Sequence, residues 1–186
     1  MTNLIDATLE HDHASLDQLL TELDQALAAP YQDRAFELLD LFWARLAVHI
    51  RAEHLHLFPA LVNASSQFSG DDSLPSFVEV AKAIAHLRSD HDFFMKELAD
   101  MMKNMRDIRE NKSSFQEERG ELRERLSVIR TRLKSHNKLE EEYVYVWPKR
   151  VLDQKTLAAL ASRVQHELEN LPPRFALPFD DVRDEN

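Results

Sequence analysis

The sequence predicts an all-α protein, namely an antiparallel up-and-down four-helix bundle followed by a short fifth helix and a C-terminal tail. Three observations support this fold class. Apolar residues recur at helical spacing through four long segments, the 186 residues include only two glycines, and the prolines lie mainly near the ends of periodic segments. This composition leaves little turn chemistry for a β protein.

The apolar period and the punctuation residues set the expected elements. Ser76 and Ser114 each precede a glutamate by three residues, the spacing of a capping box, and so mark the start of the third and fourth helices. The steps Phe58-Pro59 and Trp147-Pro148 are expected to terminate the second and fourth helices. The five helices are expected at about residues 3–28, 33–58, 76–108, 114–146 and 154–169.

The domain organisation follows from these helices. Residues 1–150 are expected to form the bundle, built from two helix-pair repeats at about 3–62 and 76–150, and residues 151–186 to form the C-terminal helix and a proline-containing tail.

Charge and composition exclude several classes of function. The formal charge of −10 and the pI near 5.3 argue against a nucleic-acid or anionic-membrane partner, since both require a basic surface. The absence of cysteine excludes disulfides, thiolate catalysis and sulfur-ligated metal sites. The N-terminal residues do not read as a signal peptide, and no apolar run is long enough to span a bilayer, so a cytoplasmic location is expected.

Ionisable residues interrupt the apolar stripe of every long helix. Each of the four helices turns one histidine toward the core, and the second and fourth add a glutamate one turn later. Buried ionisable groups are costly unless they are paired, hydrogen-bonded or bound to a metal. The residues concerned are His13, His49, Glu53, His91, His136 and Glu140.

The two halves of the chain repeat this pattern. Asp-His-x-x-Leu-x-x-x-Leu at 12–20 parallels Asp-His-x-x-Phe-x-x-x-Leu at 90–98, and Leu-x-x-His-x-x-x-Glu at 46–53 recurs at 133–140. Any one of these histidines alone is more simply a satisfied core residue. Two facing helix pairs, however, would bring four imidazoles and two carboxylates to one depth of the bundle, which predicts a metal site.

These motifs resemble those of hemerythrin-like (HHE cation-binding) domains, and the resemblance covers roughly residues 13–148. It implies a four-helix bundle with a non-haem di-iron centre. His13, His49, His91 and His136 would be terminal ligands, and Glu53 and Glu140 would bridge the two irons, together with a solvent-derived oxo or hydroxo bridge. Imidazole and carboxylate ligands without thiolate suit iron, with zinc or manganese as alternatives.

Three departures from the family pattern bear on the site. Oxygen-carrying members have a further histidine one turn before the third-helix ligand, where this chain has Leu87, and His86 lies about 100° away around the helix. His54 replaces a frequent glutamate after the first bridging residue. The second half also has two extra residues before its proline.

Four residues near the six are candidates for an extra ligand or for an outer contact: His86, His54, His56 and Tyr143. Tyr145 is a second candidate for such a hydrogen bond, although helix-end packing is the simpler interpretation of both tyrosines.

The function implied by the resemblance is binding or handling of O2, NO or H2O2, in oxygen sensing, stress response or iron handling. Its alternatives are a di-iron enzyme that reduces NO or peroxide or repairs iron centres, served by a reductase or another partner protein, and a bundle that acts mainly as a protein-interaction module. A ferritin-like carboxylate site is disfavoured, because neither His91 nor His136 has a glutamate three residues earlier.

Overall fold

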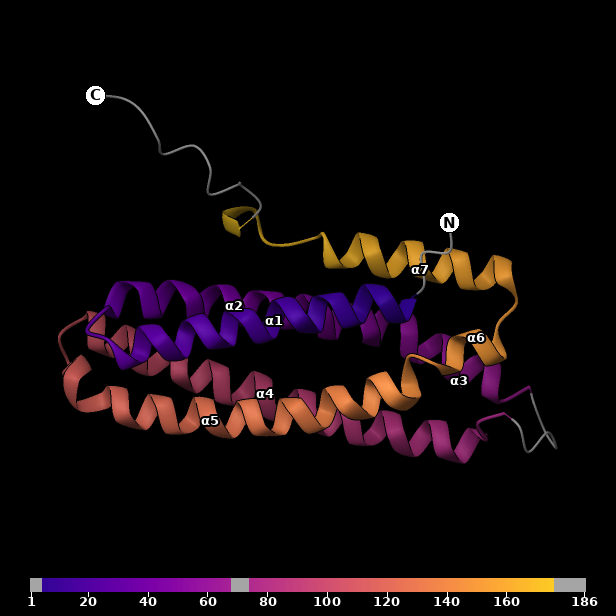
Figure 1. Ribbon diagram of the computed structural model, residues 1–186, viewed down its shortest axis with the longest axis horizontal. Coiled ribbons are helices and arrows are strands. Elements are labelled where there is room, and N and C mark those ends of the chain that lie inside the picture. Colours follow the sequence, from indigo (N-terminus) through magenta and orange to yellow (C-terminus); the bar gives the residue numbers. More distant parts are fainter. Residues whose placement is uncertain (1–4, 68–73, 176–186) are drawn as a thin grey trace, which may run out of the picture.

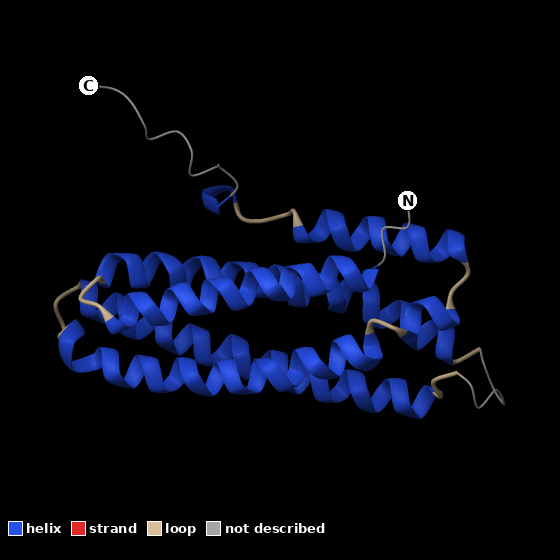
Figure 2. Cartoon of the chain, viewed as in Figure 1, coloured by secondary structure: helices blue, strands red, loops and turns tan. Residues whose placement is uncertain are grey.

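The computed structural model of the protein describes residues 5–67 and 74–175, and every regular element in this part of the chain is a helix (Figure 2). The prediction of an all-α protein is therefore confirmed. The elements are α1 (Ile5–Ala28), α2 (Gln32–Ala52), the π-helical turn η1 (Glu53–Leu57), α3 (Phe58–Ser65), α4 (Phe77–Arg109), α5 (Phe115–Leu139), the π-helical turn η2 (Glu140–Val144), α6 (Trp147–Val151), α7 (Gln154–Leu168) and the 3-10 turn η3 (Pro173–Phe175). The end of the expected tail, residues 176–186, lies outside the described residues.

Four long helices lie alongside one another, and successive long helices run in opposite directions (Figure 1). Contacts join α1 to α2, α2 to α4, α4 to α5 and α5 to α1, so that each has two neighbours. The shorter α7 packs against α1, α2 and η1. No helix of the described residues is long and apolar enough to cross a membrane.

The apolar interior consists of two clusters of buried side chains. One includes Leu16, Leu46, Phe94 and Leu133, and the other includes Leu9, among others from α3, α4 and α7. Along the chain, each of the four inward histidines stands between a residue of one cluster and a residue of the other. Burying a large apolar side chain contributes about 1.5–3 kcal/mol, so the two clusters supply the stability that a polar layer between them costs.

Two of the long helices begin at the expected serines, but only one of the capping boxes forms. Ser76 accepts a bond from the Glu79 backbone N–H (3.3 Å), and the Glu79 side chain accepts one from the Ser76 N–H (2.8 Å). Ser114 makes no side-chain cap bond, so that prediction was wrong. Asp153 caps α7 by accepting from the backbone of Thr156 at 2.9 Å.

The expectation that an aromatic-proline step ends the helix was wrong for Phe58-Pro59 and confirmed for Trp147-Pro148, because the helix formed by α5 and η2 ends at Val144, before that step. At Glu53 the helix widens into a π turn, closed by a bond from the Phe58 N–H to the Glu53 carbonyl, and then continues as α3 to Ser65. Pro59 lies in the first turn of α3, where a missing N–H leaves no bond unmade. In the second half Pro148 occupies the first turn of α6 in the same way.

Candidate metal centre

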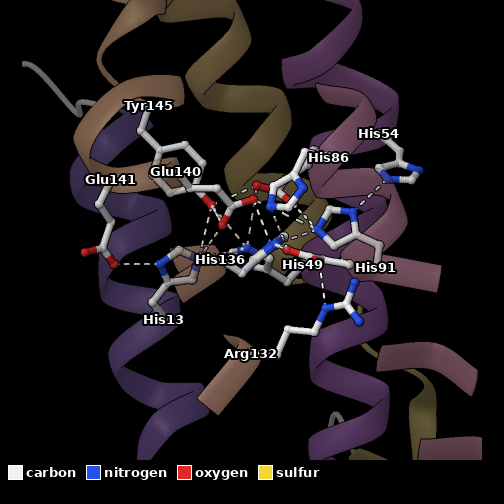
Figure 3. A network of polar contacts seen from close by, with 12 residues as sticks. His13, His49, His54, His86, His91, Arg132, His136, Glu140, Glu141 and Tyr145 are labelled. Atoms are coloured by element: carbon white, nitrogen blue, oxygen red, sulfur yellow. Dashed lines mark hydrogen bonds and ion pairs between the residues drawn. The ribbon is translucent and has the colours of Figure 1, made fainter. Parts of the chain in front are cut away.

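The six ionisable residues of the apolar stripes meet in one buried cluster (Figure 3). The four histidines come one each from α1, α2, α4 and α5, and the two glutamates are the first residues of the π turns η1 and η2. None of the six is more than 4% exposed: His13, His49, Glu53, His91, His136 and Glu140.

Within the cluster the histidines form two pairs that face each other through Nε2. The Nε2 atoms of His13 and His49 are 3.2 Å apart, and those of His91 and His136 are 3.0 Å apart. Two groups of side chains have ligand atoms close enough to hold an ion. One contains His13, His49 and Glu140, and the other contains Glu53, His91, His136 and Glu140.

Each glutamate directs one oxygen toward each histidine pair. Glu140 places Oε2 at 3.2 Å from His13 Nε2 and Oε1 at 3.0 Å from His136 Nε2. Glu53 places Oε2 at 3.3 Å from His91 Nε2 and Oε1 at 3.8 Å from His49 Nε2. The two carboxylates thus lie between two equivalent sets of nitrogen atoms.

An aspartate-arginine pair orients one histidine in each half of the chain. Asp12 accepts from His49 Nδ1 at 2.9 Å and from Arg45 at 2.7 Å. Asp90 does the same for His136 (3.2 Å) and Arg132 (2.7 Å). Because Nδ1 donates outward, the neutral ring presents the Nε2 lone pair to the cluster.

The charges around Asp12 keep it ionised. Burial would raise the pKa of this carboxyl, but the hydrogen bond and charge of His49, together with Arg45, lower it below its usual range. An ionised aspartate is a strong acceptor, so the orientation of His49 is firmly fixed.

The other two histidines are oriented by the residue that follows each glutamate. Glu141 accepts from His13 Nδ1 at 2.8 Å, and His54 Nε2 lies 2.9 Å from His91 Nδ1. Burial and the nearby charges of His91 and Arg88 lower the pKa of His54, so its neutral ring can accept this bond.

The buried carboxylates are short of hydrogen-bond donors. Among the described residues, Oε2 of Glu53 and Oε1 of Glu140 accept no hydrogen bond, although each lies near a histidine nitrogen. An orphaned buried carboxylate oxygen is costly, and a cation between these oxygens and the inward nitrogens would satisfy both. The donor set therefore fits metal ions.

Without a metal, protons supply the positive charge. Burial would lower the pKa of His13, but hydrogen bonds with Glu140 and Glu141 and the charges of Glu140 and Glu53 raise it to about 9. Burial would likewise lower the pKa of His136, but Glu140 raises it. In turn, the charge of His136 and the bonds from these histidines hold the pKa of Glu140 well below its usual range, against the effect of burial.

The remaining candidates from the sequence are more exposed than the six residues of the cluster. The His86 side chain is 64% exposed and lies 3.7 Å from Asp90, while Leu87 is fully buried in the apolar interior. His56 lies 3.7 Å from Glu167 of α7. Tyr143 is half exposed.

Sequence reasoning undervalued Tyr145, whose side chain is fully buried within the cluster. Its hydroxyl donates to Glu53 Oε1 at 2.8 Å and lies 3.1 Å from Glu140 Oε2. In an α-helix, residues 143 and 144 would share the face of Glu140. The π turn instead brings Tyr145 back to that face, with its N–H bonded to the Glu140 carbonyl at 2.8 Å.

A bundle of helices that buries a histidine and carboxylate cluster defines a class of metal-binding helical proteins. The model of the hemerythrin HHE cation-binding domain matches residues 4–147, and the chain belongs to this family. Comparisons with curated proteins and with solved structures gave no match. The family and the buried cluster together fit a metal-binding protein.

Proposed function

We propose that this chain is a non-haem di-iron protein of the up-and-down four-helix type, which binds or handles a small ligand such as O2, NO or peroxide. The observation that carries the proposal is the pairing in the cluster. Each of two histidine pairs is faced by one oxygen from Glu53 and one from Glu140. This arrangement supports two cations that share both carboxylates.

The donor types support iron. Four imidazoles and two carboxylates form a nitrogen and oxygen set that suits iron, with zinc and manganese as the competing ions. When bound, a pair of irons would supply open coordination positions and electrons for a small diatomic ligand or peroxide. Bridging carboxylates would also offset the charge of two cations in a buried layer.

The chain's own residues position this layer and surround it with apolar side chains. Asp12 with Arg45, and Asp90 with Arg132, fix the ring orientation of two of the histidines from outside the cluster. Apolar side chains close the cluster above and below, including the fully buried Leu9. Such a site admits small apolar molecules more readily than ions or water.

Metal content and the optical spectrum test the proposal. The full chain is purified without a histidine tag, reconstituted anaerobically with Fe(II), and compared before and after exposure to air and azide. Two irons per chain and near-ultraviolet bands that shift with azide are expected. Little iron after reconstitution would refute the proposal.

Two histidine variants sharpen this test. His91→Ala removes an inward nitrogen and should lose at least one iron. His11→Ala changes an exposed histidine of α1 that lies two residues from His13, and it should retain both irons. Equal iron loss in the two variants would show that the buried cluster is not the binding site.

A further inference from the structure

The hydroxyl of Tyr145 lies inside the cluster, on the side of His13 and His49 (Figure 3). Its oxygen is 3.1 Å from His13 Nε2 and 3.3 Å from His49 Nε2. It is also 2.8 Å from Glu53 Oε1 and 3.1 Å from Glu140 Oε2. The oxygen is therefore within hydrogen-bond distance of four atoms that are themselves candidate ligands.

A proton count shows that the hydroxyl and its four neighbouring atoms hold more lone pairs than protons. A hydroxyl has one proton to donate, and both carboxylate oxygens can only accept. His13 and His49 donate from Nδ1 to Glu141 and Asp12, so once a metal displaces the extra proton that His13 holds in the metal-free cluster, both rings present lone pairs at Nε2. Five lone-pair atoms thus converge on one small volume, which is the arrangement that a cation requires.

The corresponding residue of the first helix pair, Phe58, has no such oxygen. Phe58 follows Glu53 by five residues, as Tyr145 follows Glu140, and each residue closes its π turn with a backbone bond to that glutamate. The Phe58 ring stacks on His91, with centroids 6.1 Å apart and planes inclined by 9°. The pseudo-repeat therefore places a hydroxyl beside one histidine pair and an apolar ring beside the other.

We propose that Tyr145 is a seventh protein ligand, whose oxygen binds the metal held by His13 and His49. This inference rests on the proposed di-iron function. A seventh ligand makes the centre asymmetric, with five protein donors on the side of His13 and His49 and four on the side of His91 and His136. The side of His91 and His136, which has one donor fewer, would then offer the position for a small ligand, next to the Phe58 ring that stacks on His91.

Metal binding has to remove the hydroxyl proton. In the metal-free cluster the phenol keeps its proton and donates it to Glu53 Oε1. A bound cation reverses the local charge and favours the phenolate. The proton leaves to solvent together with the other protons that the cluster releases when metal binds.

The test uses the full-length chain, loaded anaerobically with Fe(II) and then oxidised by air to Fe(III). A phenolate bound to Fe(III) gives a visible charge-transfer band and resonance-enhanced ring vibrations. We expect both in the wild-type chain and their complete loss in Tyr145→Phe, with circular dichroism and helix content unchanged. Tyr143→Phe is the matched control, because Tyr143 is half exposed, and it should keep the band.

The outcomes separate this inference from the proposed function. Two irons per chain without the band, or a band that persists in Tyr145→Phe, would overturn the tyrosine ligand while leaving the di-iron proposal standing. A chain that takes up no iron would overturn both. The wild-type spectrum is decisive by itself, so the test does not depend on the stability of the variant.

Discussion

Replacing Glu53 by leucine should have opposite effects on the metal-free and metal-bound protein. Glu53 is fully buried, its Oε2 accepts no hydrogen bond among the described residues, and its Oε1 receives only the Tyr145 hydroxyl. A buried acceptor left without a hydrogen bond costs about 1–3 kcal/mol, and an apolar side chain of similar volume removes that cost. The metal-free Glu53→Leu variant should therefore unfold no more easily than the wild type.

Bound metal should make the wild type more stable than Glu53→Leu. A ligand that binds only the folded chain, present at a hundred times its dissociation constant, adds about 2.7 kcal/mol to the free energy of unfolding. For a chain of this length, 1 kcal/mol corresponds to about 2–4 °C in Tm, so the wild type should gain about 5–10 °C. Glu53→Leu removes a carboxylate shared by both metals and should gain almost nothing.

Thermal unfolding followed by circular dichroism, with and without anaerobic Fe(II), measures both effects. Glu142→Leu is the control, because Glu142 has a 51% exposed side chain two residues from Glu140. It should change the free energy of unfolding by no more than about 0.5 kcal/mol and keep the full gain from metal. A loss of about 3 kcal/mol or more in metal-free Glu53→Leu, or a gain from metal equal to that of the wild type, would refute this prediction.

Three further predictions concern protons, orientation and helix capping. The pKa of His13 is raised from 6.5 to about 9, so its contribution to metal-free stability, of order 3 kcal/mol, is fully present below pH 6.5 and lost as the pH rises through 9. Chemical unfolding across this range checks it, and a flat profile would contradict it. Asp12→Asn and Asp90→Asn should each weaken metal binding about 10–100-fold in a chelator competition assay, whereas Asp40→Asn, whose partner is Arg174, should not. Ser76→Ala should cost about 1 kcal/mol of unfolding free energy by loss of its cap, with unchanged metal content.

Periodicity was sufficient to place the histidines. His13, His49, His91 and His136 lie in phase with neighbouring apolar residues, and a residue in phase with the buried stripe is itself buried. The repeat of two helix pairs then placed Glu53 and Glu140 at the same depth as these rings.

The π turns could not be read from the same pattern. They add a residue to one turn of the helix, and nothing in the apolar spacing near Glu140 shows where that residue is inserted. This is why α-helical spacing did not distinguish Tyr145 from Tyr143 as the tyrosine that faces the cluster. It is also why Pro59 was predicted to end a helix that continues to Ser65. The local backbone at the two glutamates decides which side chains complete the site.

The outer partners of the histidines depend on contacts between helices. Asp12 and Asp90 stand beside His13 and His91 in the sequence, yet each hydrogen-bonds a histidine of the neighbouring helix in the same pair. Pairings of this kind require the relative rotation of two helices, which a single helical period does not contain.

The most direct test of the account is X-ray absorption at the iron edge on the reconstituted wild-type chain. Two irons that share Glu53 and Glu140 should show an iron-iron scattering shell at no more than about 4 Å, with only nitrogen and oxygen donors around each metal. A single iron per chain without such a shell would contradict the shared-carboxylate centre on which the proposed function rests.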